Sequence, residues 1–286
     1  MTSSEIDVPE LALNDGRTIP QLGFGVFQVP PAETAKVTLD AFEAGYRHID
    51  TAQMYANEKG VGEAIATSGL DRDDVYVTTK LNNTFHKPAD ARVAFEQSLE
   101  RLGLEQVDLF LIHWPLPTRY DGDFVSTWNT LIEFQADGRA RSIGVSNFQV
   151  DHLARLAAET SVVPAVNQIE VHPYFGNEDV RAAGAAAGIL TEAWSPIAQG
   201  AVLDDAVITG IADRIGRTPS QVTLRWHIQR GDIVFPKTLS PERMRENAAI
   251  FDFELGAEDL AAITALDRGA DGRRGPNPST FDWIPD

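Results

Sequence analysis

The sequence predicts a single α/β domain folded as a parallel (β/α)₈ barrel, and three observations support this prediction. Eight short apolar segments of the kind that form buried strands alternate with longer segments of helical period. The length of 286 residues, which alone would also allow two domains, is compatible with a single barrel of about 250 residues. No linker, short repeat or low-complexity tract interrupts the chain. We therefore expect one domain over residues 1–286, with a doubly wound open sheet as the alternative fold.

The first segment of the chain is expected to form a β-hairpin that does not belong to the barrel wall. It contains E-L-A-L and T-I-P-Q on either side of Asn14, Asp15 and Gly16, and an Asp-Gly pair favours a tight hairpin turn. Because this segment precedes the first barrel strand and has no helix of its own, we predict that it plugs the barrel floor.

Barrel strands are expected where β-branched, aromatic and leucine residues form short runs, and helices where apolar residues recur every three to four positions. The predicted strands are Leu22–Phe27, Tyr46–Asp50, Val75–Lys80, Val107–His113, Arg141–Val145, Ala165–Glu170, Ile189–Trp194 and Asp232–Phe235. The predicted helices include Ala32–Ala44, Ala89–Leu102, Val125–Ala136, Asp151–Glu159, Glu178–Ala187, Asp204–Ile215 and Pro219–Gln229.

The last segment, residues 269–286, is rich in Gly, Pro and Arg and is predicted to lack regular structure. It is either a frayed tail or a loop folded back over the barrel mouth. Phe281, Trp283 and Ile284 favour the loop, because apolar side chains gain nothing in a disordered tail.

Composition excludes several classes of function. The absence of cysteine rules out disulfides and thiolate nucleophiles, and the six scattered histidines show no metal-ligand spacing, so no metal site is expected. A formal net charge of −18 argues against nonspecific binding to nucleic acid or to an anionic membrane. The N-terminus does not resemble a signal peptide, and no run approaches the roughly 20 apolar residues that span a bilayer. We expect a cytoplasmic, monomeric protein.

Four polar side chains lie at or just after the ends of predicted strands. Asp50, Lys80 and His113 each close an apolar run, and Tyr55 follows Asp50 in a loop. Taken singly, each has a structural explanation: a turn residue, a buried ion pair, a core histidine or a packed tyrosine. In a barrel, however, the carboxyl ends of all strands open onto the face that carries the active site. The fold therefore predicts that the four side chains converge there.

Their chemistry is complementary. An ammonium beside a phenol favours the phenolate and lowers the pKa of the tyrosine, and an aspartate keeps that lysine charged and in place. Tyr55 is then suited to act as a general acid. His113, as a neutral imidazole, is suited to donate a hydrogen bond to a substrate oxygen.

The chain resembles the aldo-keto reductase superfamily, and within it the prokaryotic 2,5-diketo-D-gluconate reductase-like branch. The matching stretches run nearly end to end: L-G-F-G-V-F at 22–27, G-Y-R-H-I-D-T-A-Q-M-Y at 45–55, N-E-K-G-V-G-E-A-I at 57–65, V-T-T-K at 77–80, S-L-E-R-L-G-L-E-Q-V-D-L-F-L-I-H-W-P at 98–115, G-V-S-N-F at 144–148, N-Q-I-E-V-H-P at 167–173, S-P-I-A-Q-G at 195–200 and P-K-T-L-S-P-E-R-M-R-E-N at 236–247. The resemblance implies a catalytic tetrad of Asp50, Tyr55, Lys80 and His113. It also implies NADPH-dependent reduction of aldehydes or ketones, keto-sugar acids included.

The resemblance further implies a cofactor site without a Rossmann fold, and the chain has no G-x-G-x-x-G after a strand. Trp194 stands where most members have Tyr, and Ala198 stands where Gly is usual. On the nicotinamide side, the resemblance implies that the carboxamide is bound by Ser146, Asn147 and Gln168 and that the ring stacks on Trp194. It also implies that the pyrophosphate is covered by the loop with Ser195, Pro196 and Gln199. On the adenosine side, it implies that the 2′-phosphate is bound by Lys237, Thr238 and Arg243 and that the adenine contacts Asn247.

Lys237 and Arg243 belong to a cluster of positive charge that follows the last predicted barrel strand, which is unusual in so acidic a chain. Guanidinium and ammonium groups pair with a 2′-phosphate, which NADH lacks, so we expect NADPH to be preferred. Arg245, in the same stretch, is interpreted as a solvated surface residue.

Substrate contacts are implied for Phe27, Gln53, Trp114 and His113. Gln53 replaces a commoner small residue, and either narrows the pocket or binds a substrate hydroxyl. Two other functions stay open: a nicotinamide-binding regulatory or sensor subunit, and an unrelated barrel hydrolase. The complete tetrad argues against the first, and the lack of a second catalytic carboxylate or metal site argues against the second.

Overall fold

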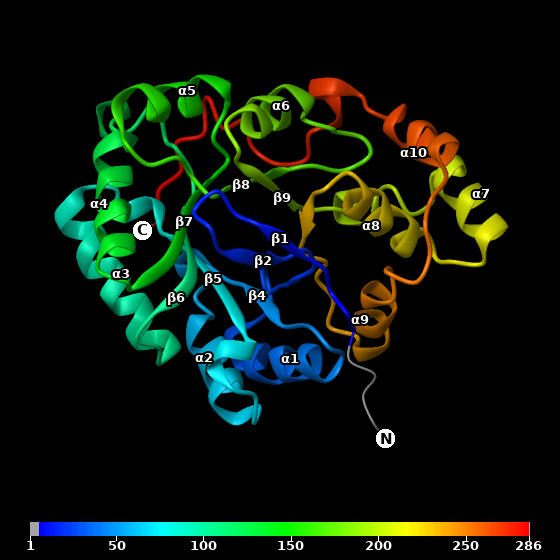
Figure 1. Ribbon diagram of the computed structural model, residues 1–286, viewed down its shortest axis with the longest axis horizontal. Coiled ribbons are helices and arrows are strands. Elements are labelled where there is room, and N and C mark those ends of the chain that lie inside the picture. The colour runs from blue at the N-terminus through cyan, green and yellow to red at the C-terminus, as the bar shows by residue number, and fades with distance from the viewer. Residues whose placement is uncertain (1–5, 286) are drawn as a thin grey trace.

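The computed structural model describes residues 6–285 and is a closed parallel barrel surrounded by helices, as predicted (Figure 1). Eight strands follow one another in chain order, each parallel to the next. A parallel bridge between Leu22 and Val234 joins the first strand to the last and closes the barrel. The open-sheet alternative is therefore wrong. The barrel strands are β3 (Phe24–Gly25), β4 (His48–Asp50), β5 (Tyr76–Leu81), β6 (Val107–Ile112), β7 (Ala140–Ser146), β8 (Val166–Glu170), β9 (Leu190–Trp194) and β10 (Ile233–Val234).

Helices alternate with the strands and cover the outside of the barrel (Figure 1). The apolar stripes of these helices pack against the outer faces of the strands and form the main core, which explains the helical period of their sequences. They are α1 (Pro31–Glu43), α2 (Glu58–Thr67), α3 (Pro88–Leu102), α4 (Phe124–Ala136), α5 (Val150–Glu159), α6 (Glu178–Ala186), α7 (Ala206–Ile215), α8 (Pro219–Gln229), α9 (Pro241–Ala248) and α10 (Ala257–Thr264). None of the helices in residues 6–285 has the length and apolar character to cross a membrane.

The N-terminal hairpin plugs the barrel floor as predicted. Strands β1 (Glu10–Ala12) and β2 (Thr18–Pro20) pair in antiparallel fashion, and Gly16 in the turn has a φ of +86°. Leu13 and Ile19 of the hairpin are buried against apolar side chains in the barrel interior. The floor is thereby closed to a ligand that enters from the mouth.

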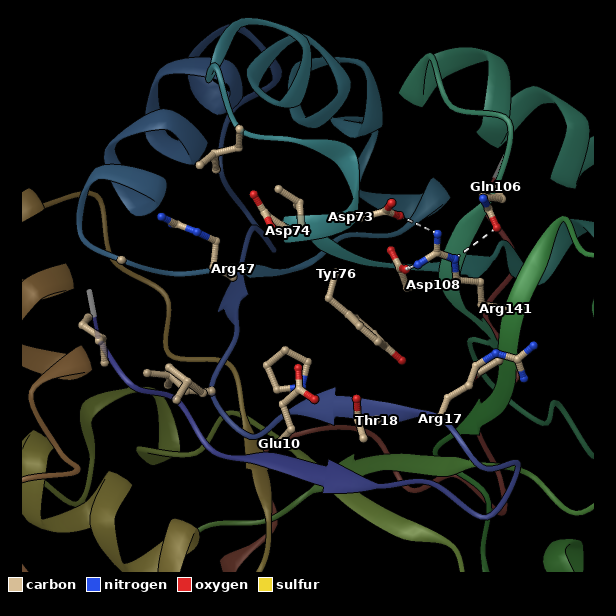
Figure 2. Close-up of a pocket in the computed structure, with 18 of the residues that line it drawn as sticks. Glu10, Arg17, Thr18, Arg47, Asp73, Asp74, Tyr76, Gln106, Asp108 and Arg141 are labelled. Atoms are coloured by element: carbon tan, nitrogen blue, oxygen red, sulfur yellow. Dashed lines mark hydrogen bonds and ion pairs between the residues drawn. The ribbon is translucent and has the colours of Figure 1, made fainter. Parts of the chain in front are cut away.

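Between the hairpin and the amino ends of β5, β6 and β7 lies a cavity of about 920 Å³ (Figure 2). Arg141 on one wall pairs with Asp73 and Asp108, and the ring of Tyr76 extends toward the hairpin. The Tyr76 hydroxyl is buried and has no hydrogen-bond partner within residues 6–285. Because this cavity lies at the floor, it is separate from the strand ends at which the predicted catalytic residues meet.

The C-terminal segment returns to the barrel mouth, in agreement with the loop prediction. The Phe281 ring packs on Trp114 with 4.1 Å between ring centroids, and the Trp283 carbonyl accepts a hydrogen bond from Asn83 at 3.0 Å. The Trp283 side chain itself is 53% exposed. Backbone contacts and Phe281, more than Trp283, thus hold this segment to the mouth.

Candidate active site

The four residues predicted to act together do meet at the mouth of the barrel. Asp50 ends β4, Lys80 is the penultimate residue of β5, and His113 directly follows β6. Tyr55 ends a short 3₁₀ turn that begins three residues after Asp50. The Nζ atom of Lys80 donates to Oδ1 of Asp50 at 2.7 Å and lies 3.4 Å from the Tyr55 hydroxyl. Strand ends that are distant in sequence thus bring a carboxylate, an ammonium and a phenol into one hydrogen-bonded group.

Burial and the neighbouring charges together determine which of these side chains carry a proton. Burial lowers the pKa of Lys80, but Asp50, with smaller contributions from Tyr55 and Glu192, more than compensates, so the pKa lies above its ordinary value and the ammonium stays charged. Burial raises the pKa of Tyr55, and the Lys80 ammonium offsets only part of that increase. The expected effect of Lys80 is therefore present, but the expectation of a net lowered pKa for Tyr55 is wrong. The phenol holds its proton at neutral pH, which is the form that a general acid needs.

His113 packs against the ring of Tyr55. Its ring centroid is 5.6 Å from that of Tyr55 in an edge-on arrangement. Burial and the charge of Lys80 lower the pKa of His113 well below its ordinary value, so the imidazole is neutral. Its Nδ1 atom is buried and has no hydrogen-bond partner among the described residues. A neutral imidazole beside the phenol is suited to orient an oxygen atom.

A second hydrogen-bonded group adjoins the first and contains the residues predicted to hold a nicotinamide carboxamide. Asn147, with a φ of +66°, donates from Nδ2 to the backbone oxygen of His113 at 2.9 Å. Its Oδ1 accepts from Nε1 of Trp194 at 2.9 Å, which fixes the indole. Ser146 donates from Oγ to the backbone oxygen of Gln168 at 2.8 Å. The amide, the hydroxyl and the aromatic ring thus form one support beside the tetrad.

Gln168 connects this support to the tetrad. Its Nε2 donates to Oδ1 of Asp50 at 2.8 Å and to Oε2 of Glu192 at 3.0 Å, which uses both of its protons. Only the carbonyl oxygen of the Gln168 side chain is then left for another partner. Of the donor and acceptor roles expected for Gln168, the geometry supports the acceptor role, which suits the amino group of a carboxamide.

The loop after β9 follows an unusual path. Ser195, Ala198 and Gln199 all have positive φ, at 50°, 49° and 55°. Non-glycine residues in such conformations cost on the order of 1 kcal/mol or more each, and they gather at ligand-binding loops. The backbone oxygen of Pro196 is held by Nε2 of His227 at 3.0 Å. The left-handed φ at Ala198 explains why glycine is expected there, and the loop adopts the bend with alanine.

The predicted phosphate ligands lie after β10 and in α9. Lys237 and Arg243 are exposed, and neither forms an ion pair within residues 6–285, although most cations of this acidic chain do. Ser240 caps α9 by accepting from the backbone nitrogen of Arg243 at 3.3 Å. Asn247 is buried and accepts from Ser220 at 2.7 Å. Unpaired cations beside a capped helix start fit a phosphate group chemically.

Aromatic side chains border the tetrad. Phe27 is 54% exposed and lies 5.0 Å from the Tyr55 ring, measured between centroids. Trp114 is buried beneath Phe281 of the C-terminal segment. An apolar wall around a polar centre suits a small carbonyl compound.

The side-chain amide of Gln53, predicted to line the substrate pocket, already has hydrogen-bond partners within the chain. Its Nε2 donates to the backbone oxygen of Ala94 and to Oγ of Ser98, both at 2.8 Å, and its Oε1 accepts from the backbone nitrogen of Asn82 at 2.7 Å. The side chain is buried against α3 with these bonds made. Gln53 thus ties the turn that carries Tyr55 to α3 and to the end of β5, and its predicted contact with a substrate stays a prediction.

The Gln53→Ala variant is expected to lose about 2–3 kcal/mol of unfolding free energy, because two buried hydrogen bonds and one partly buried one are removed at roughly 1 kcal/mol each. We expect kcat to fall as the turn loosens, with KM nearly unchanged. Denaturant unfolding and steady-state kinetics on the same preparation measure both effects. A raised KM with unchanged stability would instead support the predicted contact between Gln53 and the substrate.

Two buried carboxyl groups outside the catalytic tetrad were not predicted from the sequence. Glu192 lies at an inward position of β9, where alternation along the strand was a usable signal. Glu170 ends β8 as Asp50 ends β4, and its buried carboxylate accepts backbone N–H groups of Arg274 and Gly275 at 2.5 and 3.0 Å. It thereby fastens the C-terminal segment over Trp194, so close that a Cβ on Gly275 would lie 2.4 Å from the indole.

Comparisons with known proteins match most of the chain. The Aldo/keto reductase family model matches residues 21–268. An aldo-keto reductase of Mycolicibacterium smegmatis is 49% identical over 275 residues, which cover 96% of this chain and 98% of that protein. Methylglyoxal reductase DkgA of Escherichia coli is 44% identical over 273 residues, 95% of this chain and 97% of that protein. A crystal structure of a Gox0644 mutant in complex with NADPH is 43% identical, with a TM-score of 0.92 over 96% of this chain and 99% of that one.

Proposed function

Because the chain belongs to the aldo/keto reductase family, we propose that it reduces small aldehydes and ketones with Tyr55 as the general acid. The family, together with NADPH-bound and NADP-bound relatives, makes the chain an NADP(H)-dependent oxidoreductase. The observation that carries the assignment of roles is the hydrogen-bonded group of Asp50, Lys80 and Tyr55 at the barrel mouth.

The residues of the mouth fit a phosphorylated dinucleotide. Lys237, Thr238 and Arg243 would hold the 2′-phosphate, in keeping with cations that lack an acidic partner in the described chain, and Asn247 would contact the adenine. The positive-φ loop with Ser195 and Gln199 would cover the pyrophosphate. Ser146, Asn147 and Gln168 would hold the carboxamide beside Trp194. When bound, the reduced nicotinamide supplies the hydride that adds to the carbonyl carbon.

The chain's own residues manage the proton. His113, as a neutral imidazole, orients the carbonyl oxygen toward the Tyr55 hydroxyl. As negative charge grows on that oxygen, Tyr55 gives it the phenolic proton, and the alcohol forms. The Lys80 ammonium stabilises the tyrosinate left behind, and Asp50 keeps Lys80 in place. Tyr55 then regains a proton from solvent.

We propose a 2-oxoaldehyde such as methylglyoxal as the substrate class, because a relative that is 44% identical over nearly the whole chain is a methylglyoxal reductase. Phe27, Trp114 and Phe281 form an apolar border suited to a small, uncharged carbonyl compound. Keto-sugar acids such as 2,5-diketo-D-gluconate are the second candidate class. A single domain that acts as a cytoplasmic monomer stays a prediction.

The test is NADPH oxidation with methylglyoxal, simple aldehydes, ketones and 2,5-diketo-D-gluconate at equal concentration. We expect turnover, with the highest kcat/KM for the 2-oxoaldehyde. Tight NADPH binding without turnover on any of these compounds would favour the alternative, a nicotinamide-binding regulatory subunit.

The pH dependence of the two reaction directions should differ. Reduction needs Tyr55 protonated and alcohol oxidation needs it ionised, and burial raises the pKa of this phenol. The pH optimum for reduction should therefore lie below the pH optimum for oxidation, because the rate of oxidation rises as Tyr55 ionises. Paired rate–pH profiles on one alcohol–carbonyl couple measure this. Coincident optima would assign the proton transfer to another group.

A further inference from the structure

Glu192 is a buried carboxyl group beneath the tetrad that the mechanism does not use. It lies on β9, its side chain has no exposed surface, and its register neighbour on β8 is Gln168. Oε2 accepts from Nε2 of Gln168 at 3.0 Å, whereas Oε1 is buried without any hydrogen-bond partner in the part of the chain described. An ionised carboxylate with an unpartnered buried oxygen is strongly unfavourable.

The neighbouring groups show why a negative charge on Glu192, in addition to the charge on Asp50, is unfavourable. Asp50, on the opposite side of the barrel, accepts from the same Nε2 atom of Gln168 at 2.8 Å. Lys80 is the one cation among the groups that affect Glu192, and it already pairs with Asp50 at 2.7 Å. Burial, with a smaller contribution from Glu192, raises the pKa of Tyr76 well above its ordinary value, so this phenol is uncharged, and Ile233, the neighbour on β10, carries no charge.

We propose that Glu192 is a positioning residue that holds a proton beneath the catalytic tetrad and acts on Asp50 through the Gln168 amide that the two carboxyl groups share. When Glu192 is protonated, Asp50 is the counter-ion of Lys80, and the Gln168 amide bridges the carboxyl groups of Asp50 and Glu192. The inference rests on the proposed function of the tetrad.

Loss of this proton should weaken carbonyl reduction. Burial and the nearby Asp50 raise the pKa of Glu192 to about 8, so it ionises in weakly alkaline solution. The new negative charge attracts the Gln168 amide away from Asp50 and makes Tyr55 a weaker acid, since a like charge disfavours the phenolate. The ionised form is therefore the less active one.

The first test needs neither cofactor nor substrate. Infrared difference spectra between the wild type and Glu192→Gln should show the band of a protonated carboxylic acid at about pH 6 and its loss as the pH passes through about 8. The matched control is Glu254→Gln, which removes an exposed carboxylate and should show no such band. Absence of the protonated band would overturn the proposal.

Stability gives a second readout of the same proton. Because the folded-state pKa lies above the ordinary value of 4.5, the wild type should lose stability relative to Glu192→Gln as the pH rises from about 4.5 to about 8, and should show no further loss above that. Thermal unfolding over this range measures the difference. A difference in Tm that does not vary with pH would contradict a titrating Glu192.

The kinetic test links the proton to the tetrad. Glutamine imitates the protonated carboxyl, so Glu192→Gln should match the wild-type kcat within about twofold at pH 6–7 and exceed it by up to about tenfold one pH unit above the pKa. An unchanged pH profile, or a variant that is inactive at all pH values, would overturn the positioning role. If the wild type itself reduces no carbonyl, the proposed function fails, while the infrared and stability tests still decide whether Glu192 is protonated.

Discussion

The Tyr55→Phe variant is expected to lose about 10²–10⁴-fold in kcat for carbonyl reduction while its Kd for NADPH changes little. The loss follows from the position of the hydroxyl, 3.4 Å from the Lys80 ammonium at the mouth of the barrel. Phenylalanine keeps the ring that packs on Phe27 and His113 but has no proton to give. Steady-state kinetics with methylglyoxal and a fluorescence titration with NADPH separate the two effects.

Related variants make this result specific. Lys80→Met should be nearly as severe, because the tyrosinate loses the cation that stabilises it, whereas Asp50→Asn should be milder because an amide still accepts a hydrogen bond from Lys80. Tyr76→Phe makes the same chemical change at the barrel floor, on a hydroxyl without a partner in residues 6–285, and should leave kcat unchanged. Normal turnover by Tyr55→Phe would contradict the assignment of Tyr55 as the general acid of the tetrad.

Replacing Lys237 and Arg243 with neutral residues should weaken NADPH binding by about 10²-fold or more and leave NADH binding nearly unchanged. Each charge-assisted contact to a phosphate contributes roughly 1.5–3 kcal/mol before solvent screening. Both side chains are exposed and free of acidic partners in the described chain, so their removal should disturb the fold little. The salt dependence of NADPH binding should flatten at the same time.

Arg245 provides the matched control for this pair. It lies in α9 with Arg243, is exposed and also forms no ion pair within residues 6–285, but was interpreted as a solvated surface residue. Arg245→Gln should therefore leave the NADPH affinity within about twofold. An equal loss of NADPH and NADH affinity in the Lys237 and Arg243 double variant would mean that these residues support the fold and do not bind the phosphate.

The fold was predictable where local pattern and tertiary packing agree. The strand Val107–Ile112 is apolar except for Asp108 because both of its faces are buried, and its predicted and observed bounds differ by one residue. Helix α2 was not predicted. Its sequence contains Gly60 and Gly62, which disfavour a helix, but a Cβ at Gly62 would lie 2.2 Å from the Leu102 oxygen, so close packing against α3 requires the glycine.

The site was predictable where strand ends determine it. Asp50, Lys80 and His113 were found because a barrel brings the carboxyl ends of its strands together. The hydrogen bonds of Gln53 were not predictable because side-chain direction in a 3₁₀ turn does not follow from alternation, and its three partners come from α3 and from the residue after β5. The net pKa shift of Tyr55 was missed because it depends on burial, which sequence spacing does not supply.

The central claim is that the mouth of this barrel transfers a hydride and a proton to a carbonyl group, with Tyr55 giving the proton. Its most direct test is a single-turnover experiment in which a preformed complex of the protein with NADPH is mixed rapidly with excess methylglyoxal. We expect a fast loss of reduced-nicotinamide absorbance, stoichiometric with the protein, in the wild type, and a loss slowed by about 10²–10⁴-fold in Tyr55→Phe. Loss of absorbance at the same rate in both proteins, or none in the wild type, would contradict the claim.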